Sequence, residues 1–198
     1  MKKVTLALMC MLLAASAAMA RGDEPKSEIS LGYGLPFNTS NMCEFLADAW
    51  TGGLSNKQMD KDSYIGPLSL EYYYHTSPVV GVGVIGVYSR YKGIRTLSDN
   101  SAMVHKSKYF TIMPAVKFNW LRRDNWGLYS KIALGYTHGD FKIADEGTNA
   151  HQESADINAL NFQVSAIGVE VGSSLIRAFA EFGFGEQGVG LTGIRVRF

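Results

Sequence analysis

The chain has 198 residues, with 19 Lys or Arg against 18 Asp or Glu, and 46% of the residues are hydrophobic. This length fits one domain, and a formal net charge of +1 gives no basic excess that would attract nucleic acid. After the N-terminal segment no apolar run reaches the roughly eighteen residues that a transmembrane helix needs.

The N-terminus is typical of a secretory signal peptide over residues 1–20. Lys2 and Lys3 give a basic start, residues 4–15 are mostly apolar, and Ala18-Met19-Ala20 forms a small-x-small cleavage site. The mature, exported domain is therefore expected over residues 21–198. Cys43 is the only cysteine in that range, so the sequence predicts no internal disulfide.

Beyond residue 27 apolar and polar side chains alternate with the period of two that indicates β-strands. Each segment has about the nine to eleven residues, or slightly more, that a tilted strand needs to cross a bilayer. The expected fold is an all-β, eight-stranded antiparallel up-and-down transmembrane β-barrel. Its strands are predicted at 27–36, 64–75, 79–91, 108–120, 126–138, 157–171, 175–184 and 188–198.

The connections between these strands are alternately long and short. Long polar connections are expected at 37–63, 92–107 and 139–156, and short turns at 76–78, 121–125 and 172–174. Long loops at one end and tight turns at the other are typical of outer-membrane barrels. The last connection at the long end, 185–187, is brief and departs from this pattern.

Between the strand ends, one face of the strands is apolar and the other carries the charges. In 108–120, for example, the even positions carry Phe110, Ile112 and Phe118, while Lys117 lies on the odd face. An Arg or Lys on the lipid side at mid-membrane costs about 2–4 kcal/mol, so the charged faces should point inward. Two segments break the pattern: 79–86 is apolar on both faces, and 162–171 changes face midway, which a β-bulge would explain.

The inward charges form the main candidate site. The interior of an eight-stranded barrel is only wide enough for side chains, and buried charges must be paired. We therefore expect a salt-bridged plug and no open pore. The expected set, four acids and five bases, is Glu28, Glu71, Lys117, Lys131, Glu170, Arg177, Glu181, Arg195 and Arg197.

The first long connection contains a short amphipathic helix pattern. Asn41 and Glu44 make a capping pair, and Gly52-Gly53 ends the apolar spacing that follows it. This helix is expected to pack on the barrel rim, or alternatively to bind a partner. Its apolar residues are Met42, Phe45, Leu46, Ala49 and Trp50.

Two G-x-G-x-x-G patterns, at 81–86 and 188–193, match the dinucleotide-binding fingerprint. That fingerprint must open a helix, whereas the residues after 86 favour a strand and the chain ends five residues after 193. The glycines are better explained as space inside a small, curved barrel. No nucleotide or other cofactor is expected.

The histidines, His75, His105, His138 and His151, are scattered, so no metal site is expected. An outer-membrane enzyme that modifies lipid A would need a Ser–His–acid set at the membrane rim. The only local candidate is His151 with Ser154 and either Glu153 or Asp156. Solvated turn and loop residues explain all these histidines more simply, and no catalytic residue is assigned.

The hairpin TIMPAVKFNWLRRDNWGLYSKIALGY and the aromatic C-terminus resemble those of small OmpA/OmpX-type outer-membrane barrels of Gram-negative bacteria. In such families the barrel-assembly machinery recognises the last strand. The resemblance implies an assembly signal at Ile194, Val196 and Phe198. The short last connection and the long first one depart from the OmpX type, and no catalytic motif carries over.

The sequence thus predicts a monomeric outer-membrane barrel that contacts lipids and lipopolysaccharide. Its expected role is non-enzymatic: structural, or surface interaction with an extracellular ligand through long loops. Two alternatives remain open, a channel or carrier for small molecules and a lipid A-modifying enzyme.

Overall fold

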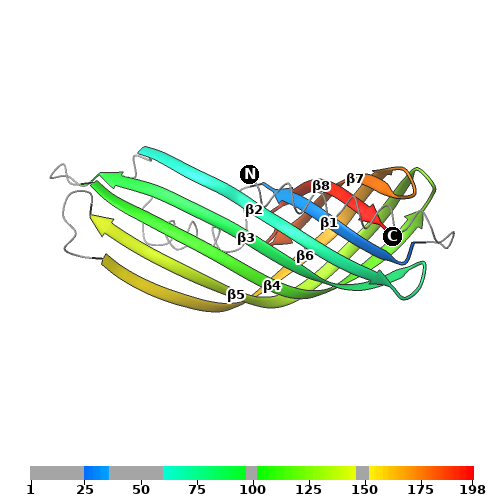
Figure 1. Ribbon diagram of the computed structural model, residues 1–198, viewed down its shortest axis with the longest axis horizontal. Coiled ribbons are helices and arrows are strands. Elements are labelled where there is room, and N and C mark those ends of the chain that lie inside the picture. Colours follow the sequence, from blue (N-terminus) through cyan, green and yellow to red (C-terminus); the bar gives the residue numbers. More distant parts are fainter. Residues whose placement is uncertain (1–24, 36–59, 97–101, 146–151) are drawn as a thin grey trace.

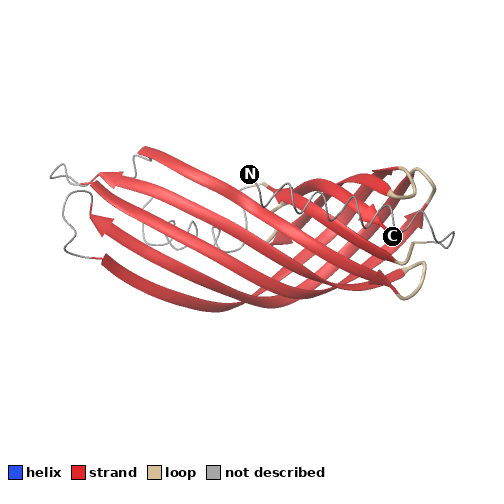
Figure 2. Cartoon of the chain, viewed as in Figure 1, coloured by secondary structure: helices blue, strands red, loops and turns tan. Residues whose placement is uncertain are grey.

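The computed structural model describes the main chain of residues 25–35, 60–96, 102–145 and 152–198. Side chains are described for residues 25–35, 65–91, 107–140 and 157–198. These residues form one closed barrel of eight antiparallel strands in chain order (Figure 2). The fold class expected from the sequence is therefore confirmed. The predicted signal peptide and the expected helix residues Met42, Phe45, Leu46, Ala49 and Trp50 lie outside the described residues.

The strands are β1 (Ser27–Gly34), β2 (Asp60–His75), β3 (Val80–Thr96), β4 (Ala102–Arg122), β5 (Trp126–Asp145), β6 (Gln152–Gly172), β7 (Ile176–Gly185) and β8 (Gly190–Arg197). Closure is made by β1, which pairs with β2 on one side and with β8 on the other. Leu31, for example, is opposite both Leu70 and Ile194. At the turn end, the main-chain amides of Ser27 and Phe198 each donate to the other residue's carbonyl oxygen at 2.8 Å.

The outward face of the barrel is apolar. Side chains such as Leu134, which is 63% exposed, follow one another at alternate positions around the sheet. Aromatic residues mark the ends of this band: Trp120 and Tyr74 near the short turns, and Tyr88 and Phe110 at the other end. A continuous exposed apolar belt with aromatic edges would be unfavourable in water and is typical of a lipid-facing barrel surface.

Strands β2 to β6 are much longer than β1, β7 and β8, and they extend past them at one end of the barrel (Figure 1). Pairing of β3 with β4 continues to Thr96 and Ala102, and pairing of β5 with β6 to Ala144 and Gln152. The expected long loops at 92–107 and 139–156 are therefore wrong, because most of these residues are strand. Apolar alternation marks only the lipid-facing part of a strand, whereas main-chain pairing continues beyond it.

The change of face expected within 162–171 is confirmed by a β-bulge in β6. The register of β6 shifts against both neighbours, between Ser165 and Ile167 on the β7 side and opposite Ser130 on the β5 side. Ala166 and Ile167 are both exposed, so the inward positions change from odd to even numbers. This shift brings Glu170 to the inside.

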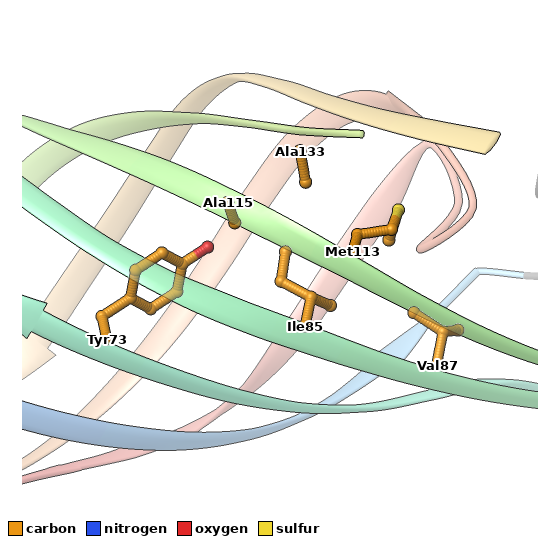
Figure 3. Close-up of a cluster of buried hydrophobic side chains, with 6 residues drawn as sticks. All are labelled: Tyr73, Ile85, Val87, Met113, Ala115 and Ala133. Carbon is orange, nitrogen blue, oxygen red and sulfur yellow. The ribbon is translucent and has the colours of Figure 1, made fainter. Parts of the chain in front are cut away.

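The inner surface has an apolar side. Six buried side chains cluster on the inner wall formed by β2, β3, β4 and β5 (Figure 3): Tyr73, Ile85, Val87, Met113, Ala115 and Ala133. This cluster explains why residues 79–86 read as apolar on both faces, since Ile85 faces the interior while Val84 faces outward. The charged side chains occupy the remaining interior.

Three inward aromatic rings lie across glycines of a neighbouring strand. Tyr73 is opposite Gly83, Tyr129 opposite Gly168, and Phe179 opposite Gly193. A Cβ atom at any of these glycines would lie within 3 Å of the ring. Gly83 and Gly193 belong to the two G-x-G-x-x-G patterns. The sequence predicted that these glycines provide space inside a small barrel, and in the structure inward aromatic rings lie across them.

Substitution of Gly168 by Ala should destabilise the barrel by about 1–3 kcal/mol through overpacking. The added Cβ would lie 2.4 Å from the Tyr129 ring. Urea titration of the refolded protein, followed by tryptophan fluorescence, would measure the change. Gly86→Ala is the matched control, because its Cβ would have no neighbour closer than the Leu70 carbonyl oxygen at 3.9 Å. Equal effects of the two substitutions would contradict the packing explanation.

Candidate functional site

The structure places all nine charged residues of the expected set inside the barrel. Each is buried, and the most exposed, Glu181, is only 6% exposed. They come from seven of the eight strands, since alternation turns every second side chain of each strand inward. The set consists of Glu28, Glu71, Lys117, Lys131, Glu170, Arg177, Glu181, Arg195 and Arg197.

Arg195 of β8 lies at the centre of this network. Its Nη1 donates to Glu170 Oε2 at 2.6 Å, and its Nε donates to Ser30 Oγ at 2.8 Å. Four carboxylates surround the guanidinium, with shortest distances of 2.6, 3.4, 3.8 and 3.9 Å, in the order Glu170, Glu28, Glu71 and Glu181. One cation thus connects all four acids of the expected set.

Aromatic rings complete the surroundings of the central cations. The Arg195 guanidinium carbon lies 4.7 Å from the ring centroids of both Tyr129 and Phe179, and Lys117 Nζ lies 4.2 Å from that of Tyr129. These are favourable cation–π geometries in a desolvated interior. Tyr129 also donates its hydroxyl to Glu181 Oε1 at 2.7 Å. The Tyr129 ring, which packs against Gly168, therefore contacts two cations and one acid of the network.

The two lysines each connect two strands through carboxylates. Lys117 Nζ donates to Glu28 Oε1 at 2.6 Å and lies 3.7 Å from Glu170 Oε2. Lys131 Nζ forms ion pairs with Glu71 and, at 2.7 Å, with Glu181 Oε2. Both ammonium groups are fully buried and would be very costly without these partners.

At the turn end, two arginines close the network. Arg177 Nη1 donates to Glu170 Oε1 at 3.0 Å, and its Nη2 donates to the carbonyl oxygens of Arg123 and Asp124, both at 2.7 Å. Arg197 forms an ion pair with Glu170. The hydrogen bonds from Arg177 thus hold the β4–β5 turn at this end of the lumen.

His75, expected as a solvated turn residue, is instead 5% exposed and part of the network. Its Nε2 lies 3.0 Å from Glu28 Oε2, and its Nδ1 lies 3.4 Å from the Asn119 side-chain amide. The solvated reading is therefore wrong here, because alternation along β2 turns His75 inward with Glu71 and Tyr73. His138 is exposed and contacts Asn158 and Asp140.

The turn between β7 and β8 folds into the barrel, which the sequence did not predict. Glu186 and Gln187 are both fully buried. Gly185 and Gly188 have positive φ angles of 141° and 91°, which glycine alone adopts readily, so these two residues allow the tight reversal. The brevity of this connection was the only signal in the sequence that it differs from the others.

The two side chains of this turn extend the polar network toward the long-strand end. Glu186 accepts hydrogen bonds from Asn161 Nδ2 at 2.6 Å and from Thr111 Oγ1 at 3.3 Å. Gln187 Nε2 donates to Glu71 Oε1 at 2.7 Å, and its main-chain amide donates to Gln163 Oε1 at 2.8 Å. With Glu186 included, the buried side chains in the described part of the chain comprise five glutamates and five lysines or arginines.

The residues of the expected assembly signal differ in exposure. Ile194 is 57% exposed, as expected for a lipid-facing side chain, whereas Val196 is only 7% exposed. Val196 is opposite Ile29 of β1 and Ile176 of β7. Phe198 lies just past β8 and is half-buried. Recognition of these residues by assembly machinery stays a prediction.

Other kinds of site have less support in the structure. The side chains of the local His–Ser–acid candidate, His151, Glu153, Ser154 and Asp156, lie outside the described ones. Among the residues that are described, no group of His, Cys, Asp and Glu could hold a metal ion. Within the same residues, no helix is long and apolar enough to span a membrane.

Comparisons with known proteins found similarity in fold only. No family model matches the sequence, and no curated protein matches it. Two similar solved structures are those of Ail, the attachment invasion locus protein of Yersinia pestis, one of them in complex with the heparin analogue sucrose octasulfate. Each is 18% identical, covers 89% of this chain and 100% of the other, and has a TM-score of 0.48. The chain itself is an eight-stranded antiparallel barrel, and its exposed apolar belt with aromatic edges is that of a transmembrane β-barrel.

Proposed function

We propose that this protein is a closed, non-conducting barrel of a Gram-negative outer membrane, with a structural and surface-interaction role and no enzymatic activity. The observation that carries the proposal is the balanced interior: five glutamates face five lysines or arginines, all buried, within the described residues. In a lumen filled by mutually paired charges each buried charge has the partners that it needs, and little room is left for a solute. A closed barrel has no free edge in its membrane-spanning part, which favours a monomer.

The long strands support the surface role. From Tyr88, at the aromatic edge of the apolar band, β3 continues for eight residues to Thr96, which is about 26 Å along the strand at ~3.3 Å per residue. The edge of β6 from Gln152 to Leu160 has no paired strand on the β7 side among the described residues. Such an edge offers main-chain donors and acceptors to an extracellular ligand. The extended strands, together with the unpaired edge of β6, would thus present the interaction surface.

The proposal predicts that the purified, refolded protein forms no stable open channels in planar lipid bilayers. Ion flow would require the paired side chains, including the Arg195–Glu170 contact at 2.6 Å, to separate inside the barrel. An open porin inserted into the same bilayers serves as the positive control. Stable, stepwise conductance of the refolded protein would favour the channel alternative instead. Altered lipid A masses in cells that contain the protein would favour the enzyme alternative.

A further inference from the structure

A group of four basic residues lies on β3 and β4 beyond the apolar band. Arg90 is directly opposite Lys108, and two residues further along the same ladder Lys92 is opposite Lys106. The side chains of Arg90 and Lys108 are exposed, and neither has an ion-pair partner among the described side chains. No acidic residue lies between the four positions on these two strands.

Like charges directly opposite each other in an antiparallel pair destabilise the sheet. The pair of Arg90 and Lys108 therefore carries this cost unless an anion lies between the two cations. Asp140 is opposite Lys108 on the other side, on β5, and its carboxylate lies 3.5 Å from His138 Nε2. Asp140 therefore borders the basic group and does not separate its members.

The depth of Arg90 and Lys108 relative to the membrane indicates which kind of anion they bind. The pair that precedes them on the same ladder is Tyr88 and Phe110, which closes the apolar band with aromatic side chains. Aromatic belts lie at the level of lipid headgroups. Arg90 and Lys108 begin one step beyond this belt, at the depth where phosphate groups of outer-leaflet lipids are found.

We propose that Arg90 and Lys108 form a binding site for the phosphate groups of a phosphorylated glycolipid headgroup. The guanidinium suits bidentate contact with phosphate, and the ammonium adds a point charge. The acyl chains of the same lipid would cover the apolar surface below, beside Tyr88 and Phe110. This inference rests on the proposed outer-membrane location.

The test uses the full mature chain refolded into phosphatidylcholine vesicles that contain bis-phosphorylated lipid A. The variant R90Q/K108Q is compared with K26Q/R123Q, which removes the same charges from exposed positions at the turn end. Lipid A that stays bound after detergent extraction is measured by native mass spectrometry. Each basic residue near an anionic surface contributes about 1 kcal/mol, so R90Q/K108Q should bind roughly thirtyfold more weakly. The control should bind as the wild type does.

Several outcomes would overturn the proposal. Equal binding by R90Q/K108Q and the wild type, equal loss by the control variant, or undiminished binding of lipid A without phosphates would each exclude this site. Displacement of lipid A by excess inorganic pyrophosphate would assign the site to free phosphate compounds. Comparing boiled and unboiled protein on SDS gels distinguishes failure of the proposed function from failure of this inference alone. A protein that does not insert as an SDS-resistant barrel contradicts the proposed function, whereas an inserted barrel without lipid A selectivity contradicts only this inference.

Discussion

Replacing Arg195 with methionine is expected to lower the free energy of unfolding of the barrel by about 3–5 kcal/mol, as for other broken buried ion pairs. Methionine keeps much of the side-chain volume but removes the charge that touches four carboxylates. Glu170 and Glu28 would lose their contacts at 2.6 and 3.4 Å while both carboxylates stay buried. Urea titration of the folded protein in lipid vesicles would measure the loss.

The control for this experiment is Arg123→Met, which removes an exposed arginine from the β4–β5 turn. The interior contact of this residue uses only its carbonyl oxygen, which accepts from Arg177, so the side-chain change should cost less than about 0.5 kcal/mol. If Arg195→Met and Arg123→Met had similar effects, the interior charges would not stabilise the barrel, and a hydrated lumen would be the better description.

A second large effect is expected at Lys131. Lys131→Met should also cost about 3–5 kcal/mol, because the ammonium group separates the carboxylates of Glu71 and Glu181. Adding Glu181→Gln removes one of these two negative charges and keeps a carbonyl oxygen to accept from the Tyr129 hydroxyl. The double variant should therefore be more stable than Lys131→Met alone. Equilibrium unfolding of the wild type, both single variants and the double variant gives the coupling free energy.

We expect this coupling to lie in the range of about 0.5–3 kcal/mol that contacting residues show. Simple addition of the two single effects would mean that Lys131 and Glu181 do not interact in the folded barrel. Arg90→Gln combined with Glu181→Gln is the matched control, because Arg90 lies on the outer surface of β3 and contacts none of the interior acids. That pair should give additive effects.

Much of the architecture could be predicted from the sequence, because a lipid environment imposes a rule that acts at each residue. A charge cannot face the hydrocarbon without a large cost, so the two-residue period assigns Lys117, Glu71 and Arg195 to the interior without knowledge of their partners. The same rule revealed the change of face in β6, which the bulge near Ala166 explains. The strand number and the turn positions followed from this alternation.

The rule fails where residues leave the membrane. Strands β3 to β6 continue past the apolar band, where alternation of hydropathy no longer reports on pairing, so residues 92–107 and 139–156 were expected as loops. His75 at the other end was expected in solvent for a related reason. Its place next to a turn suggested exposure, but β2 continues to His75, so the same alternation that turns Glu71 and Tyr73 inward also buries this side chain.

An eight-stranded barrel whose charges point inward at the level of the apolar band follows from the residue pattern alone, because the cost of desolvation sets the direction of each side chain there. The partners of these charges follow only from the folded barrel. Arg195 and Glu28 are joined because closure of the barrel brings β8 beside β1. Glu186 and Gln187 are interior residues because Gly185 and Gly188 turn the chain inward, a conformational choice that no periodicity records. The contacts that fill the lumen therefore depend on distances between residues far apart in the chain, which strand alternation cannot specify.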